Sequence, residues 1–268
     1  MSAGTRLKAA VASVRNELRR TNFAGRSVTL GEGVAVAAAL VGVGAAASRG
    51  RGGRAGVEAA ALAAIAALGL VDDLVEPRRR RSGDAVAKGL AGHLGALRRG
   101  RVTTGAAKAL GIPAIALVQA CAAPKERAVL EEAMLVAGLA NLLNLLDLRP
   151  GRALKATLLI SAPLALAGPD SPRGAAGAAL ARGTAAVAAC ALPSDLGERG
   201  MLGDCGANVL GAALGSAIAR RSPRPVRLAV LAGVAGLTLA SERVSFTAVI
   251  DRTPALRAVD RLGRRADA

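Results

Sequence analysis

Long apolar stretches separated by short charged segments constrain this chain more than any other feature of its sequence. A helix needs about 20 apolar residues to cross the hydrocarbon layer of a bilayer, and about 17 are sufficient. Eight candidate spans cover residues 28–48, 56–74, 105–123, 128–147, 154–168, 174–192, 203–219 and 225–241. The fifth is short and the sixth contains Arg182. The pattern predicts an all-α, polytopic bundle of transmembrane helices.

The composition favours a membrane protein over a soluble one. Hydrophobic residues make up 52% of the chain, yet it has two Phe and no Trp or Tyr, and a soluble core of this size would normally contain more aromatic anchors. Abundant Ala and Gly suit the close approach of helices in lipid. The alternative is an alanine-rich soluble helical protein, but several spans lack the polar face that a soluble amphipathic helix needs.

The net charge of +17 raises the question of nucleic acid binding, because Lys and Arg neutralise phosphates. The basic residues form short clusters between apolar runs, and the chain has almost no aromatic side chains for base stacking. We therefore expect no nucleic acid partner, and we interpret the basic clusters as topology signals and contacts with membrane lipids. Cys121, Cys190 and Cys205 lack the spacing of a zinc site or a disulfide framework.

The distribution of Lys and Arg predicts that both termini are cytoplasmic. With the N-terminus inside, about 25 of the 36 basic residues fall on the inner side. Two groups fall outside and weaken the bias, namely Arg49, Arg51 and Arg54, and Arg220, Arg221, Arg224 and Arg227. We expect a multi-pass protein of the plasma membrane.

Three regions follow from this topology. Residues 1–27 form a basic cytoplasmic leader, residues 28–241 the transmembrane domain, and residues 242–268 a basic cytoplasmic tail. Apolar residues recur at roughly helical spacing in the tail, which predicts an interfacial helix on the inner leaflet.

Four polar motifs interrupt the apolar pattern, and the predicted topology places all of them on the cytoplasmic side. Asp72 and Asp73 end the second span, where adjacent carboxylates commonly mark metal binding, proton transfer or ion movement. The alternative is a helix end that enters a polar loop. The second motif is a loop whose Lys, Thr and glycine amides can hold phosphate oxygens. Its candidate residues are Lys88, His93, Thr103, Thr104 and Lys108.

The other two motifs combine carboxylates with amides or glycines. Asn141, Asn144 and Asp147 are spaced by three residues, so they share one helical stripe that suits a polar ligand or hydrogen bonds between helices. Asp204 opens the seventh span between Gly203 and Gly206, which would leave room for a diphosphate beside the backbone. Asp204 could hold a hard cation shared with phosphates, or serve as an N-cap.

In these motifs the chain resembles the polyprenyl-phosphate N-acetylhexosamine-1-phosphate transferase family. The family pattern has a Gly-x-x-Asp-Asp helix end, a Lys-rich and Thr-containing loop, an Asn-x-x-Asn-x-x-Asp stripe and a Gly-Asp-x-Gly element, in the order found here. Residues 22–26 also resemble a short N-terminal element of the family, so the resemblance covers about residues 22–211. The chain departs from the pattern in having fewer spans, no histidine after His93, and residues 148–152 in place of an Asp-Gly-x-Asp-Gly extension.

The resemblance implies a magnesium-dependent phosphoglycosyl transferase whose active face is cytoplasmic. It would move a sugar 1-phosphate from a UDP-sugar to polyprenyl phosphate and release UMP, in cell-envelope glycan biosynthesis. Asp72, Asp73 and Asp204 would be catalytic, and Asp204 and Asp72 would bind Mg²⁺. The substrates would contact Lys88, His93, Thr103, Thr104, Lys108, Asn141, Asn144 and Asp147.

The sequence is compatible with a homodimer as well as with a monomer. Two other functions stay open at this stage. The first is a non-catalytic homologue that binds a polyprenyl lipid or an envelope partner. The second is a small transporter, which would also explain acidic residues within the membrane. A transporter predicts polar residues near the centres of the spans, whereas here they gather at the ends of the spans.

Overall fold

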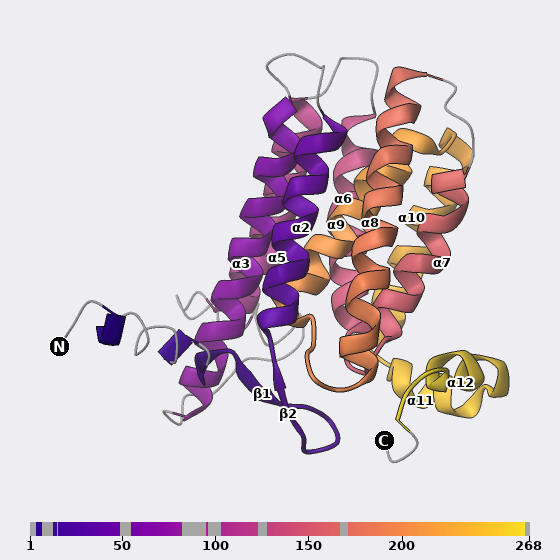
Figure 1. Cartoon of the computed structure of the whole chain (residues 1–268). Coiled ribbons are helices and arrows are strands. Elements are labelled where there is room, and N and C mark those ends of the chain that lie inside the picture. Colours follow the sequence, from indigo (N-terminus) through magenta and orange to yellow (C-terminus); the bar gives the residue numbers. More distant parts are fainter. Residues whose placement is uncertain are drawn as a thin grey trace.

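The computed structural model is a bundle of helices (Figure 1). It describes residues 4–6, 13–14, 16–48, 55–81, 95, 103–122, 128–166 and 171–265. The long helices are α2 (Gly31–Ala47), α3 (Ala55–Arg81), α5 (Thr104–Cys121), α6 (Val129–Leu146), α7 (Arg152–Leu166), α8 (Pro172–Leu196), α9 (Gly203–Arg221) and α10 (Arg224–Ser241). Two short helices follow, α11 (Phe246–Arg252) and α12 (Pro254–Arg261). The helical fold class is confirmed.

The long helices lie side by side and alternate in direction along the bundle (Figure 1). Strands β1 (Arg19–Thr21) and β2 (Ser27–Thr29) pair as an antiparallel hairpin just before α2. The hairpin, the start of α9 and the helices α11 and α12 all lie at one end of the bundle, which we call the site end (Figure 1). The opposite end, where α3 and α6 begin, is called the far end.

Four of the described helices are long and apolar enough to cross a membrane. They are α5, α6, residues Arg173–Leu196 of α8, and α10. Among the other long helices, α2 has 17 residues and α7 has 15, so these two are shorter than the four candidates. A membrane protein is thus supported, while eight spans and the orientation stay predictions.

Helix α9 lies at the centre of the bundle, packed against α2, α3, α6 and α8. Its residues from Cys205 to Ala219 are buried. Two glycines allow α6 to come close, because a Cβ at Gly211 would lie 2.2 Å from the Leu139 carbonyl oxygen and one at Gly215 would lie 2.6 Å from that of Leu135. This is the close backbone contact that small residues permit between helices in lipid.

Arg182, the charge within the sixth candidate span, is exposed on α8. Its guanidinium donates a hydrogen bond of 3.3 Å to the carbonyl oxygen of Ala165, in the last turn of α7. The last carbonyls of a helix have no partner within it, so a cation there is favourable. The contact explains how this span accommodates a charge.

Three of the arginines that the topology places outside are paired with acidic residues at the far end, while Arg49, Arg51 and Arg54 lie outside the described residues. Arg220 forms a buried ion pair with Glu58 of α3. Arg224 and Arg227 both contact Glu131 of α6, at 2.8 Å and 3.1 Å. These three arginines join helices to one another.

Candidate functional site

Three of the polar motifs meet at the site end, around the ammonium group of Lys108. The Lys108 Nζ atom lies 2.6 Å from Asp72 Oδ2 and 2.5 Å from Asp204 Oδ2. These residues come from α3, α5 and α9, and their side chains are 5%, 15% and 20% exposed for Asp72, Lys108 and Asp204. The chain thus brings two carboxylates and one cation together from positions far apart in sequence.

A glycine one turn before Asp72 permits this arrangement. A Cβ at Gly69 would lie 2.4 Å from the carbonyl oxygen of Asp204 and 2.7 Å from the Cα atom of Cys205. The missing side chain therefore lets α3 approach the first turn of α9. This contact brings the Asp72 and Asp204 carboxylates within reach of one lysine.

The glycines beside Asp204 serve helix packing instead of leaving open space. Gly203 has a φ of +58°, and a Cβ there would lie 2.7 Å from Leu30 Cδ2 and 3.0 Å from both carboxylate oxygens of Asp73. A Cβ at Gly206 would lie 2.7 Å from the Cα atom of Gly33. The expected room for a diphosphate beside these glycines is occupied by protein.

Asp73 stabilises the start of α9. Its two carboxylate oxygens accept hydrogen bonds from the backbone N–H groups of Asp204, at 3.1 Å, and Cys205, at 2.9 Å. The N-cap residue of this helix is Leu202, which offers no side-chain cap. The first N–H groups of a helix need such acceptors, and a negative charge suits this end of the helix dipole. Asp73 therefore supplies the cap, and the N-cap alternative for Asp204 is wrong.

The residues of the third motif lie in two different environments, one buried near the start of α9 and one exposed beside α10. Asp147 follows α6 directly, is buried, and lies within hydrogen-bonding reach of the backbone N–H of Gly203. Asn144 is half-buried, whereas Asn141 is exposed and donates to Thr238 Oγ1 of α10 at 3.4 Å. Of this motif, Asp147 lies nearest to the start of α9.

The second motif contributes from the start of α5. Thr103 is the N-cap of this helix, and its hydroxyl accepts a hydrogen bond of 3.0 Å from the Ala106 N–H. Thr104 lies beside Asp72. Capping fixes the first turn of α5, which carries Lys108 one turn later. Lys88 and His93 lie outside the described residues.

Sequence reasoning missed Glu198, which anchors the N-terminal hairpin to the loop before α9. Its side chain is 1% exposed, accepts from Arg26 at 2.9 Å and accepts from Asn22 Nδ2 at 2.5 Å. The backbone of Thr29 also bonds to Arg199 and Met201 on either side of Gly200. The resemblance of residues 22–26 to a family element signals the hairpin, but nothing in the sequence indicates its partner.

The carboxylates at Lys108 fit part of a magnesium site. Asp72 Oδ1 is buried without a hydrogen-bond partner in the part of the chain that the structure describes. Within those same residues no three His, Cys, Asp or Glu side chains lie close enough to hold a metal ion. Mg²⁺ often takes only one or two carboxylates from protein, and phosphates and water complete its shell. Asp72 and Asp204 are therefore suitable ligands for Mg²⁺ that arrives with a phosphate substrate.

Comparisons of the chain with protein-family profiles, with curated proteins and with solved structures find no match. The resemblance to the polyprenyl-phosphate transferases rests on the four residue motifs. The fold adds that residues of the first, second and fourth motifs are in direct contact through Asp72, Lys108 and Asp204.

Proposed function

We propose that this protein is a membrane phosphoglycosyl transferase that moves a sugar 1-phosphate from a UDP-sugar to polyprenyl phosphate. The observation that carries the proposal is the contact of Lys108 with both Asp72 and Asp204. Two carboxylates beside a lysine suit a reaction between phosphates, because the carboxylates can hold a divalent cation and the lysine can hold phosphate oxygens. Charge neutralisation is the main requirement of such a transfer.

The proposed reaction exchanges one phosphorus–oxygen bond for another. A phosphate oxygen of polyprenyl phosphate attacks the sugar-linked phosphorus of the UDP-sugar, and the bond from that phosphorus to the bridging oxygen breaks. The products are polyprenyl diphosphate sugar and UMP. Mg²⁺, when bound by Asp72 and Asp204, would supply charge neutralisation at the phosphates. The Lys108 ammonium would give up its ion pair with Asp72 or Asp204 and bind a phosphate oxygen instead. Asn144 and Asp147 would face the nucleotide.

The same proposal includes the orientation of the protein. Eight spans with both termini inside would place the site end at the cytoplasmic face of the plasma membrane. The site would then be open to UDP-sugars from the cytoplasm. The alternation of the long helices supports an even number of crossings between the hairpin and α11 (Figure 1).

One observation favours a second candidate, a non-catalytic homologue that binds a polyprenyl lipid or an envelope partner. Lys108 already forms ion pairs with both Asp72 and Asp204 without a ligand. A buried ion cluster of this kind can be retained for structure alone. The two candidates differ in whether the cluster opens to bind a cation and phosphates.

Purified protein incubated with polyprenyl phosphate, Mg²⁺ and a panel of UDP-sugars tests the proposal, with release of UMP as the measurement. We expect release with at least one UDP-sugar and loss of release in Asp204→Asn, which keeps the size of the side chain but removes its charge. Asp251→Asn, the same change at an exposed position of α11, is the matched control and should remain active. Absence of UMP from the unmutated protein with every UDP-sugar would favour the non-catalytic candidate.

A further inference from the structure

Helix α12 has an apolar row that the rest of the protein leaves uncovered. Leu256, Val259 and Leu262 are spaced by three residues and are 48%, 49% and 70% exposed. Asp260, on another side of the same helix, is buried against the bundle. The helix is therefore attached to the bundle by a polar side, and its apolar row faces away from the protein core.

A buried ion pair holds α12 in this orientation. Arg152, at the start of α7, donates from Nε to Asp260 Oδ1 at 2.8 Å, and both side chains are buried. Lys155 donates to the backbone carbonyl oxygens of Val259 and Asp260 at 3.0 Å and 2.8 Å. Arg264 contacts Asp260 at 2.9 Å from the C-terminal side. These polar contacts together fix the rotation of α12 about its own axis.

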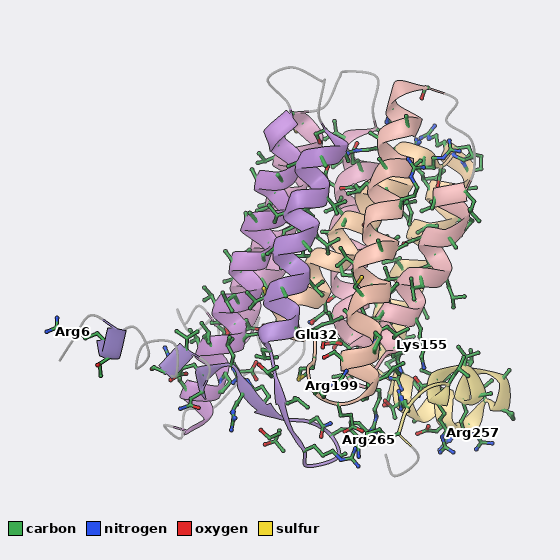
Figure 2. The ribbon with its side chains drawn as sticks, in the orientation of Figure 1. Arg6, Glu32, Lys155, Arg199, Arg257 and Arg265 are labelled. Atoms are coloured by element: carbon green, nitrogen blue, oxygen red, sulfur yellow. The ribbon has the colours of Figure 1, made fainter. Side chains whose placement is uncertain are left out.

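Exposed arginines lie on the side of α12 opposite the apolar row. Arg257 and Arg261 are spaced by four residues on α12, so they share one face of the helix, and Arg252 and Arg265 are exposed nearby. Figure 2 shows that Lys155, Arg257 and Arg265 all lie at the site end of the bundle. An apolar row on one face and arginines on the opposite face are typical of a helix that lies in the membrane interface.

We propose that α11 and α12 form a docking surface for anionic phospholipids, fixed to the bundle by the Arg152–Asp260 ion pair. The apolar row would enter the boundary between headgroups and acyl chains, and Arg257 and Arg261 would contact the phosphates of the headgroups. A lipid surface is favoured over an acidic soluble protein, because the apolar helices that end beside α11 and α12 bring the bilayer boundary to this end of the bundle (Figure 1). The proposal does not depend on the transferase activity.

A dye at residue 262 tests the lipid surface in nanodiscs. The dye is attached to Leu262→Cys in a background where Cys121, Cys190 and Cys205 are changed to Ala. Nanodiscs contain either phosphatidylcholine alone or its mixture with phosphatidylglycerol, each with and without brominated acyl chains. We expect emission to shift to the blue and bromine to quench it more strongly when phosphatidylglycerol is present.

Two double variants separate a specific surface from general attraction by charge. Arg257→Gln with Arg261→Gln should reduce the blue shift and the quenching that phosphatidylglycerol causes. Arg6→Gln with Arg19→Gln removes the same charge from exposed positions at the N-terminal side and should retain both effects. Equal emission in the two lipid compositions would overturn the proposal, as would equal losses in the two double variants. A blue shift produced only by an added acidic polypeptide would instead show that the surface binds protein.

Discussion

The backbone N–H of Asp204 donates a hydrogen bond of 3.1 Å to the carboxylate of Asp73, while the Asp204 carboxylate contacts Lys108. The neighbouring residue Asp72 contacts the same lysine. The two adjacent carboxylates of the first motif therefore differ in role. Asp73 positions the start of α9, whereas Asp72 lies beside Lys108 and Asp204. We propose that Asp72 binds Mg²⁺ together with Asp204 and that Lys108 binds phosphate.

This difference predicts separate effects of Asp73→Asn and Asp72→Asn. The amide nitrogen that Asp73→Asn introduces cannot accept a hydrogen bond, so this variant loses part of the cap of α9 and all of its negative charge. We expect Asp73→Asn to lower the free energy of unfolding by about 1 kcal/mol, a typical value for loss of a helix cap. Asp72→Asn leaves this cap intact and should lower the stability less, while UMP release is lost. Thermal unfolding in detergent without substrate measures the first effect, and an unchanged midpoint in Asp73→Asn would contradict the capping role.

Lys108 and Mg²⁺ should compete for the same two carboxylates. Replacing the ammonium by a neutral group in Lys108→Gln leaves Asp72 and Asp204 without their cation, so added Mg²⁺ should raise the melting temperature more than in the unmutated protein. Combining Lys108→Gln with Asp204→Asn should remove this gain. Arg19→Gln, an exposed charge removal on β1, is the control for a general effect of charge. An equal response to Mg²⁺ in Lys108→Gln and in the unmutated protein would argue against a metal site here.

The helices could be predicted from the sequence because an apolar run of sufficient length has few alternatives in lipid. The expected span 28–48 corresponds to α2, Gly31–Ala47, and 154–168 corresponds to α7, Arg152–Leu166. The end of α3 was predicted less well, since the apolar run stops near residue 74 but the helix continues to Arg81. Polarity marks the end of an apolar face, whereas Glu and Arg still favour a helix.

The site was predicted as a list of residues but not as an arrangement. Spacing places Asn141 and Asp147 on one stripe, yet Asp147 lies near the start of α9 and Asn141 contacts α10. The spacing alone cannot predict this, because the partner of each residue depends on how the neighbouring helices pack. The bridge from Lys108 to Asp72 and Asp204 joins distant segments, and no local pattern encodes it. In the tail, Pro254 opens α12 and divides the expected single helix into two.

The orientation can be tested at two exposed alanines. Ala24 lies in the turn of the hairpin at the site end, and Ala128 precedes α6 at the far end. In a background without other cysteines, Ala24→Cys should resist an impermeant thiol reagent in intact cells and react after permeabilisation. Ala128→Cys should react from outside. Labelling of Ala24→Cys in intact cells would reverse the proposed orientation.

The attachment of α12 should weaken in acid. Burial alone would raise the pKa of Asp260, but the hydrogen bond and charge of Arg152 outweigh it, and the pKa lies below its ordinary value. Because the folded-state pKa is the lower one, the stabilisation is complete above the ordinary Asp pKa of about 4 and is lost as pH falls through the lowered value. The anisotropy of the dye at residue 262, measured in neutral detergent, should fall over that range as α12 is released.

Two aspartate variants control this titration. Asp260→Asn should give low anisotropy at every pH, because the amide cannot form the ion pair with Arg152. Asp251→Asn changes an exposed aspartate of α11 and should preserve the fall in acid. A fall of the same size in Asp260→Asn would assign the transition to another group.

The far end offers a comparison of a buried and an exposed arginine. Arg220 is 9% exposed and pairs with Glu58, whose side chain is 1% exposed, whereas Arg224 is 70% exposed and pairs with Glu131. Arg220→Met should cost about 3–5 kcal/mol, since it leaves a buried carboxylate without its cation, and Arg224→Met should cost about 0–1 kcal/mol. Adding Glu58→Gln to Arg220→Met should restore much of the stability, because the remaining amide carries no charge. Unfolding in denaturant at a fixed detergent concentration measures the free energy of unfolding of all three variants. Equal losses of this free energy in Arg220→Met and Arg224→Met would show that burial does not set the strength of these ion pairs.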